Sequence, residues 1–299
     1  MAEVSIRKLT FYLGIHRSKL YQWKKRYGQE NRHNGSMNKE HWITQAEKEA
    51  VIDFYEQHRS EGYRAVAYMM IDADVAYVSC SSVYRILREH DLIRSKKNKP
   101  STKGDGFEQP LSVHEHWHTD ISYLKIAKRF YFFIGVLDGC SRYLVHWEIR
   151  ETMTERDAEI VVKRALEKNP SARPRLITDN GSQYTAHEFK HFVAAHGLTH
   201  VRTSPYYPQS NGKIERFHGT YKNESIRKKC PLTIEEAQKI TEKYVAHYNN
   251  HRLHSAIGFV TPKVKFQGRE QQVFNERKEK LEKARIMRKN QFAMLTQAC

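Results

Sequence analysis

Three carboxylates lie where apolar segments give way to short polar or glycine-containing runs. Asp120 occurs in WHTDISYL, Asp179 in LITDNGSQY and Glu215 in QSNGKIERFHG, with 35 residues between the last two. A single acidic residue is usually a solvated surface group, but a carboxylate beside an apolar strand is costly unless its charge is compensated. Oxygen ligands from separate elements suit Mg²⁺ or Mn²⁺. These three residues are therefore candidates for a metal site.

A lysine follows the last of these acids at helical spacing. Lys222 comes seven residues after Glu215, which is about two turns, so the two share a helix face with His218 or Gly219. The neighbouring apolar stripe, expected to face the core, consists of Ile214, Phe217 and Tyr221. Lys222 could therefore lie beside any metal ions that these acids hold. A lysine on a helix, taken alone, is more often a solvated charge.

The surrounding pattern predicts the elements that position these residues. Aromatic and β-branched runs indicate an antiparallel meander of three strands at 116–127, 129–137 and 142–149. Two short strands are expected at 174–178 and 198–203, and four helices at 154–168, 185–196, 212–228 and 233–250. This order predicts an α/β fold in which a mixed five-stranded sheet carries helices on its faces.

Capping patterns fix the expected starts of three of these helices. A threonine is followed three residues later by an acid in the pairs Thr154–Asp157, Thr185–Glu188 and Thr233–Glu236. Gly197 is expected to end the second of these helices. Asp120 then lies within the first strand, Asp179 directly after the fourth strand, and Glu215 in the first turn of a helix.

The N-terminal residues 5–27 have the layout of a helix-turn-helix. Two short apolar-periodic segments flank Gly14. Residues of the second segment that would face phosphates and base edges are Arg17, Lys19, Gln22, Lys24 and Lys25. An ordinary helical hairpin would show the same pattern.

Residues 44–92 predict a second unit of this kind. Thr44 and Glu47 match a capping box, Gly62 opens another short helix, and Ser79 or Ser81 caps a third. Exposed residues of the third helix include Tyr84, Arg85 and Arg88. The alternative is a purely structural three-helix bundle, but two such units beside a basic linker favour DNA binding.

The charge is concentrated at the flanks and in that linker. The 299 residues carry a net charge of +17, and residues 1–40, 94–103 and 271–299 contribute +6, +5 and +4 of it. The linker includes Arg94, Lys96 and Lys97. Basic flanks around a balanced middle indicate parts that grip a polyanion around a separate working domain. Nucleic acid is the first candidate partner and a membrane surface the second, while lysines that serve solubility alone remain an alternative.

Cysteine usage and hydropathy bear on the compartment. The four cysteines lie far apart and form no CxxC pair, which fits reduced thiols rather than disulfides or a cysteine-type zinc site. The sequence has no stretch of about 18 apolar residues and no evident secretory signal. We therefore expect a cytoplasmic protein with no membrane partner.

Taken together, these motifs resemble the DDE transposases of bacterial insertion sequences, specifically the second-frame protein of the IS-three family, and the related retroviral integrases. The resemblance covers the tandem helix-turn-helix segments, WHTDISYL, LITDNGSQY, SPYYPQSNGKIERFHGTYKNE and YNNHRLHSAIGFVTP. It includes the spacing from Asp179 to Glu215 and the position of Lys222. It implies an RNase H-like core in which Asp120, Asp179 and Glu215 bind metal.

The resemblance also implies an activity. A polynucleotidyl transferase of this kind binds double-stranded DNA, namely the terminal repeats of its element and the target. It frees a 3′-OH at the element's end by hydrolysis and then joins it to another phosphodiester, with two Mg²⁺ or Mn²⁺ ions per site. Asn180 and Gln183 are expected to shape the loop after Asp179 and contact DNA, although Asn-Gly is also a common turn. His218 and Lys222 are expected to contact DNA beside the carboxylates. Synapsis of two ends implies at least a homodimer.

The expected organisation follows from these assignments. Its parts are a helix-turn-helix at 1–30, a second helical domain at 40–93, a basic linker at 94–110, the core at 111–268 and a charged helical tail at 269–299. The tail could pack on a second protomer or on DNA, or be solvated. Two rival functions are a DNA-binding regulator with an inactive core and a single-strand transposase that uses a tyrosine with the His-hydrophobic-His motif of His116 and His118.

Overall fold

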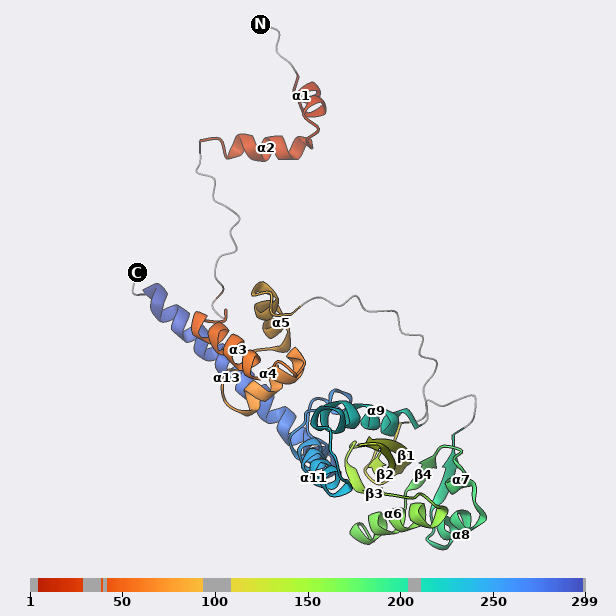
Figure 1. The fold of residues 1–299 in the computed structure, drawn as a ribbon. Helices are drawn as coiled ribbons and strands as arrows, with labels where there is room; N and C mark the ends of the chain where they lie inside the picture. Colours follow the sequence, from red (N-terminus) through yellow and green to blue (C-terminus); the bar gives the residue numbers. More distant parts are fainter. Residues whose placement is uncertain (1–4, 29–38, 40–41, 94–108, 204–210, 298–299) are drawn as a thin grey trace. The chain divides into compact units, whose positions relative to one another are not determined.

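The described part of the chain falls into two units. In the computed structural model the described residues are 5–28, 39, 42–93, 109–203 and 211–297. Contacts divide the chain into the units Met1–Trp42 and Ile43–Cys299. The first unit contains two helices, and the second contains the sheet (Figure 1). Within the described ranges, no helix is both long and apolar enough to cross a bilayer.

The first unit consists of α1 (Ile6–Tyr12) and α2 (Arg17–Lys25). Gly14 joins them with a φ of +60°, a left-handed conformation that glycine adopts without steric cost. The two predicted helices are therefore present, but they do not enclose their apolar side chains. More than a third of the side-chain surface is exposed at Leu9, Leu13 and Trp23.

The second unit begins with a three-helix bundle, formed by α3 (Gln45–Gln57), α4 (Tyr63–Asp72) and α5 (Cys80–Glu89). The predicted capping box at α3 is formed, because Thr44 accepts from the Glu47 N–H and Glu47 accepts from the Thr44 N–H. The apolar faces of the helices meet in a core that includes Val51, Val66, Met70, Val83 and Leu87. The bundle thus encloses apolar side chains, unlike the first unit.

The sheet has the predicted mixed topology. Its strands are β1 (His116–Ile126), β2 (Arg129–Asp138), β3 (Leu144–Arg150), β4 (Arg175–Thr178) and β5 (Thr199–Arg202). They are arranged in the order β3-β2-β1-β4-β5. The β1–β2 and β2–β3 pairs are antiparallel, whereas β4 is parallel to both of its neighbours.

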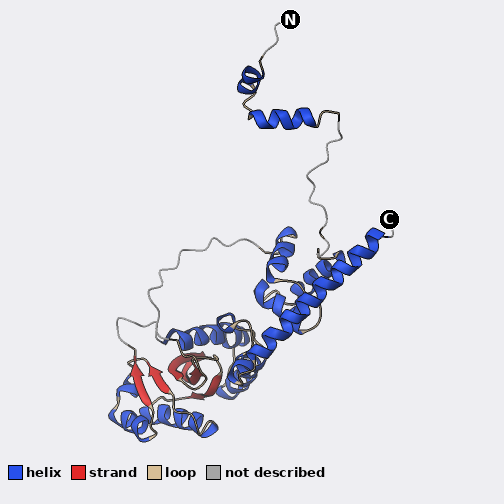
Figure 2. Ribbon diagram, turned by 180° about the vertical axis from the view of Figure 1, so that it is seen from behind, coloured by secondary structure: helices blue, strands red, loops and turns tan. Residues whose placement is uncertain are grey.

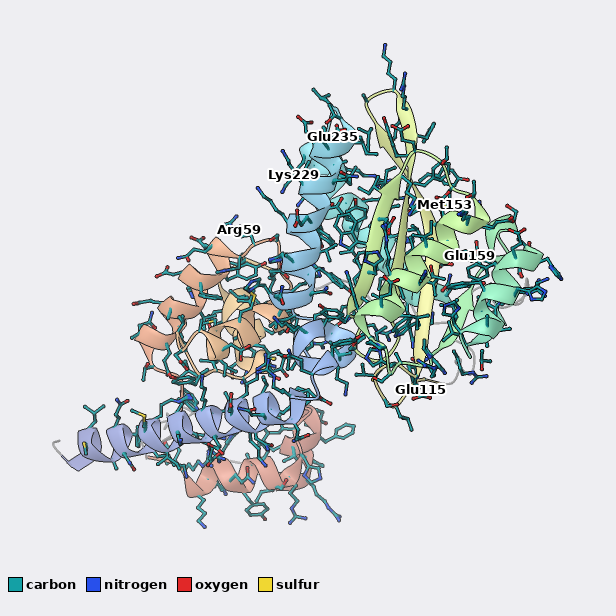
Figure 3. All side chains as sticks on the ribbon, turned by 90° about the horizontal axis from the view of Figure 1, so that it is seen from below. Arg59, Glu115, Met153, Glu159, Lys229 and Glu235 are labelled. Atoms are coloured by element: carbon teal, nitrogen blue, oxygen red, sulfur yellow. The ribbon has the colours of Figure 1, made fainter. Side chains whose placement is uncertain are left out.

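Helices cover both faces of the sheet (Figure 2). The helices α6 (Glu155–Lys168) and α8 (His187–Ala195) enclose one core with Trp117 and Ile134. On the other face, α9 (Gly212–Tyr221) and α11 (Ile234–Asn250) enclose a second core with Phe133 and Leu124. In Figure 3, Glu159 of α6 and Glu235 of α11 lie on opposite sides of the sheet. Alternation along β1 and β2 sends successive side chains into the two cores.

Two helical segments differ from the prediction. The residues after β4 form a separate short helix, α7 (Ser182–Thr185), so Thr185 ends one helix instead of capping the next. Its hydroxyl donates to the Ser182 carbonyl, and Ala186 occupies the start of α8 without a side-chain cap. The expected helix 212–228 is also interrupted. After α9 the chain widens into a π-helix, η2 (Lys222–Ile226), and then continues as α10 (Arg227–Lys229).

The charged tail packs on its own chain. After η3 (Ser255–Ile257) and α12 (Pro262–Phe266), the long helix α13 (Glu270–Gln297) runs alongside α3 and α4 (Figure 1). Arg277, 4% exposed, donates two hydrogen bonds of 2.6 and 2.7 Å to Asp72 of α4. The start of α13 is therefore held on α4 by an ion pair in which Arg277 is buried, and it is not a solvated charged helix.

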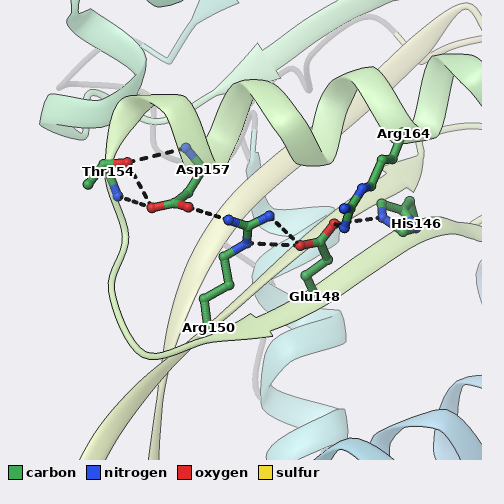
Figure 4. A network of polar contacts seen from close by, with 6 residues as sticks. All are labelled: His146, Glu148, Arg150, Thr154, Asp157 and Arg164. Atoms are coloured by element: carbon green, nitrogen blue, oxygen red, sulfur yellow. Dashed lines mark hydrogen bonds and ion pairs between the residues drawn. The ribbon is translucent and has the colours of Figure 1, made fainter.

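A compensated charge network ties β3 to α6 (Figure 4). Glu148 accepts hydrogen bonds from His146 at 3.1 Å, from Arg150 at 2.6 Å and from Arg164 of α6 at 2.6 Å. Arg150 also pairs with Asp157, whose carboxylate closes the predicted capping box at Thr154. Burial alone would raise the pKa of Glu148, but the bonds from the three donors outweigh it and lower the pKa to about 2.

Candidate active site

Neighbouring strands bring two of the three carboxylates together. β1 and β4 are parallel, with His118 opposite Ile177. Two residues further along each segment lie Asp120, within β1, and Asp179, the first residue after β4. Glu215 enters from the other direction, in the first turn of α9. The meeting point of the three residues is thus fixed by the strand register and by the packing of α9 on the sheet.

The charges of these carboxylates act on one another. Burial raises the pKa of Asp179, a hydrogen bond of 3.0 Å from the Gly181 N–H opposes that rise, and the charge of Asp120 adds to it. Burial also raises the pKa of Glu215, with further increases from Asp120 and Asp179 and a decrease from His218. The three acids therefore share one region in which negative charge is only partly compensated, a pattern common at functional sites.

The donor set suits a hard divalent cation. Carboxylate oxygens come from β1, from the end of β4 and from α9, and such oxygens are the preferred ligands of Mg²⁺ and Mn²⁺. A cation between them would remove the repulsion that raises the pKa values of Asp179 and Glu215. Among the described residues, no three His, Cys, Asp or Glu side chains are already arranged as a metal centre. The three carboxylates have the oxygen donors and the negative charge that a divalent cation needs, and their side chains must move closer together to bind it.

His218 lies beneath Asp120, on the core side of α9. Its Nδ1 atom is 3.4 Å from Asp120 Oδ2, and its ring meets Phe133 edge to face, with centroids 5.6 Å apart. The side chain is only 5% exposed. We predicted DNA contact for His218, but this burial suits it to orienting Asp120, whose Oδ1 accepts from the Ile121 N–H.

Lys222 lies where α9 passes into the π-helix. Burial lowers the pKa of Lys222, nearby Arg227 lowers it further, and the charge of Asp120 raises it. The ammonium group is therefore close enough to the carboxylates to interact with them. The structure brings Lys222 to the same site as Asp120, Asp179 and Glu215.

The amide side chains of Asn180 and Gln183 donate hydrogen bonds that fix the loop after Asp179. Asn180 donates from Nδ2 to the Thr203 carbonyl at 2.7 Å, which ties the end of β4 to the end of β5. Gln183 donates from Nε2 to the Met153 carbonyl at 3.4 Å. Both therefore shape the backbone near Asp179, as expected, and Asn180 remains exposed for contact with DNA.

Asn211 positions the catalytic helix and was not identified from the sequence. It precedes α9, is 2% exposed, and makes no capping bond to the helix. Instead its Nδ2 donates to the Thr119 carbonyl of β1, and its Oδ1 lies 3.4 Å from His118 Nδ1. A polar residue immediately before a predicted helix is normally assigned as its cap. The bond to Thr119 joins the start of α9 to the residue beside Asp120.

The other predicted DNA-binding residues lie elsewhere. All five chosen in α2 are exposed, as are Arg85 and Arg88 of α5, while Tyr84 is partly buried. The linker residues Arg94, Lys96 and Lys97 lie outside the described residues.

The His-hydrophobic-His motif does not form an open site. His116 and His118 are 1% and 0% exposed. Burial is the main reason that the pKa of His118 falls to about 3. Both imidazoles are enclosed by the protein, so this arrangement disfavours a tyrosine-dependent single-strand transposase.

Two family models match the part of the chain that carries this site. Both are described as "Integrase core domain", and they match residues 110–208 and 196–262. Together they span the whole sheet and the helices from α6 to α11. Asp120 and Asp179 fall in the first match and Glu215 in the second.

Curated relatives come from bacterial insertion elements. The chain is 25% identical over 227 residues to the "Insertion element IS476 uncharacterized 39.2 kDa protein" of Xanthomonas euvesicatoria, covering 73% of this chain and 64% of that protein. It is 29% identical over 198 residues to the "Putative transposase InsD for insertion element IS2E" of Escherichia coli, covering 62% of this chain and 90% of that protein. The match thus spans less than two thirds of the IS476 protein.

Solved structures of viral integrases are also similar. A chain of the simian T-cell lymphotropic virus intasome, solved in complex with PP2A regulatory subunit B56 gamma, is 17% identical, with a TM-score of 0.49 over 73% of this chain and 74% of that chain. The HTLV-2 integrase catalytic core domain in complex with magnesium is 18% identical, with a TM-score of 0.43 over 52% of this chain and 98% of that one. The two family models assign residues 110–262 of the chain to an integrase core domain, and the chain is similar in sequence to the IS2 transposases.

Proposed function

We propose that the chain is a DDE-type transposase that cleaves the ends of an insertion sequence and joins the freed 3′ ends to target DNA. The observation that carries this proposal is the meeting of Asp120, Asp179 and Glu215 on an integrase core, where burial, and then the charges of the neighbouring carboxylates, raise the pKa of Asp179 and Glu215. An inactive DNA-binding regulator has no need for three mutually repelling carboxylates.

In this proposal the carboxylate oxygens of all three acids hold Mg²⁺ or Mn²⁺. When bound, the ions neutralise phosphate charge and activate the attacking oxygen. The chain itself positions the reacting groups for in-line displacement and forms no covalent intermediate. His218 keeps Asp120 oriented through its 3.4 Å contact, and Lys222 binds a DNA phosphate beside the carboxylates.

The other parts of the chain bind and arrange DNA. The helices at 1–30 and 40–93, together with the basic linker at 94–110, contact double-stranded DNA at the terminal repeats. The core at 111–268 carries out the chemistry, and the tail at 269–299 secures the helical bundle. We further propose that the protein works in the bacterial cytoplasm and acts as a dimer or higher oligomer, since two element ends must be joined.

A cleavage and joining assay tests the proposal. Labelled duplexes that end in the element's terminal repeat are incubated with protein and Mg²⁺, Mn²⁺ or EDTA, and both nicked and joined products are measured. We expect products with either metal and none with EDTA, and we expect none from Asp120→Asn.

Glu215→Gln and Glu167→Gln form a matched pair, because both residues are exposed glutamates on helices. Only the first substitution should abolish the reaction. Equal activity of wild type and Asp120→Asn in Mg²⁺ would show that the enzyme proposal is wrong and would favour a regulator. A covalent DNA–protein adduct would instead favour the tyrosine mechanism.

A further inference from the structure

A cavity of about 340 Å³ lies between the start of α4 and the outer side of α9. Its lining brings together residues 61–65, residues 216–220 of α9 and residues 252–255 after α11, with Tyr248 and Phe259 beside them. Arg216, in the lining, directly follows Glu215 in the sequence of α9. Neither the chemistry proposed above nor the packing of the core uses this space.

Three arginines line the cavity: Arg64, Arg216 and Arg252. Arg252 is paired with Glu224 at 2.6 Å. Across the described residues, neither Arg64 nor Arg216 has a carboxylate within ion-pair distance, and Glu61 is the one acidic residue of the lining. The cavity therefore has an excess of positive charge that the protein leaves uncompensated.

The pKa of a histidine in the lining is consistent with this excess of positive charge. The pKa of His254, in the lining, falls to about 4, first because of burial and then because of Arg142, Arg252 and Arg216. Arg142 lies behind this wall, and its Nη1 is buried without a hydrogen-bond partner among the described residues. Three guanidinium groups thus act on one imidazole, which stays neutral and can donate a hydrogen bond.

The start of α4 adds backbone donors to these cations. Gly62 occupies the N-cap position and makes no side-chain capping bond, so the first N–H groups of the helix, at Tyr63 and Arg64, have no intrahelical acceptor. Both residues line the cavity. Guanidinium groups together with free helix N–H groups are the donors that bind phosphate oxygens.

We infer that this cavity binds a phosphodiester group of the DNA strand that is cleaved or joined at the adjacent carboxylates. The inference rests on the proposed function for the identity of the strand. Arginines from α4 and from α9 then hold one phosphate from two sides, so the helical bundle takes part in placing DNA at the core.

Salt-dependent DNA binding tests this site without requiring catalysis. Binding of a duplex bearing the terminal repeat is measured in EDTA, at several salt concentrations, for wild type, Arg64→Gln, Arg216→Gln and Lys163→Gln. Lys163 is an exposed control of equal charge on α6, on the opposite face of the sheet. For each arginine variant we expect about a tenfold rise in Kd and a loss of about one from the slope of log K against log salt. The lysine control should keep the wild-type slope.

The outcomes separate this inference from the proposed function. Because Arg64 lies on α4, an effect at both arginines cannot come from disturbance of Glu215 alone. Wild-type slopes in both arginine variants would overturn the cavity site, even if cleavage is normal. Reduced slopes in a protein that cleaves nothing would support the site and contradict the enzyme proposal. If inorganic phosphate raises the Tm of wild type and not of Arg216→Gln while duplex binding is unchanged, the site binds free phosphate and the assignment to DNA is wrong.

Discussion

The core contains two clusters of acidic residues whose pKa values are shifted in opposite directions. Around Glu148, two arginines and a histidine supply hydrogen bonds, and the pKa falls to about 2. Around Asp120, Asp179 and Glu215, like charges face one another, and the pKa values of Asp179 and Glu215 rise. The first arrangement stabilises the fold by itself, whereas the second becomes favourable only with an added cation. The pKa thus falls where a partly buried carboxylate has cationic hydrogen-bond donors, and it rises where burial is joined by like charges.

The largest effect should be on activity, when one of the three carboxylates of the second cluster is neutralised. We expect Asp179→Asn to reduce cleavage by about 1000-fold or more, equal to about 4 kcal/mol. Because the substitution removes one of three repelling charges, the free energy of unfolding should not fall. Urea denaturation of the metal-free protein measures the latter. A variant that loses activity only in proportion to lost folded protein would contradict the distinction.

Added metal should stabilise only the cluster that lacks compensation. At a Mg²⁺ concentration of 100 times the Kd, we expect the free energy of unfolding of wild type to rise by about 2.7 kcal/mol. Glu148→Gln should show the same gain, whereas Asp120→Asn and Asp179→Asn should not. Thermal melts with Mg²⁺, compared with NaCl at equal ionic strength, measure this difference. An equal gain in all four proteins would mean that the ion binds elsewhere.

Breaking the compensated cluster should cost stability. Glu148→Gln removes the acceptor of Arg150 and Arg164, and we expect it to lower the free energy of unfolding by about 2 kcal/mol. Glu167→Gln, on the exposed side of α6, should change it by less than about 0.5 kcal/mol. Urea denaturation at pH 7 compares them. Similar values for the two variants would show that the network contributes nothing measurable.

The contribution of Glu148 should also depend on pH in a defined direction. Its folded-state pKa, about 2, is below its ordinary value of 4.5, so the stabilisation is complete above pH 4.5 and is lost as the pH falls through about 2. The difference in unfolding free energy between wild type and Glu148→Gln should therefore be constant from pH 5 to 7 and shrink below pH 4.5. A difference that grows with acidification would contradict the assigned pKa.

Local patterns predicted most of the core, because its helix starts and strand alternation depend on near neighbours. The caps at Thr44, Thr154 and Thr233 were confirmed. The cap at Thr185 was wrong, since residues 182–185 form a helical turn of their own after the Asp179 loop. The spacing of Thr185 and Glu188 matches a capping pair, but it does not show that Thr185 already belongs to α7.

Features that depend on distant residues were not predictable in this way. The π-helix at Lys222 adds backbone to a turn without any proline or glycine to mark it. Asn211 bonds to Thr119, 92 residues away, and Arg277 bonds to Asp72, 205 residues away. The three carboxylates could be proposed from their positions at element ends, but the contact between His218 and Asp120 required the register of the sheet.

The junction at Arg277 has a consequence for how the protein is made. Its guanidinium binds Asp72, donates to the Phe259 carbonyl at 2.9 Å and lies over the Tyr68 ring at 4.6 Å. At 5–20 residues per second, a ribosome needs about 10–40 s to travel from the end of α5 to Arg277. During that interval the nascent chain lacks Arg277, so the contact between Asp72 and the Phe259 carbonyl cannot form. α13 can therefore make this contact between α4 and the Phe259 carbonyl only after translation has passed Arg277.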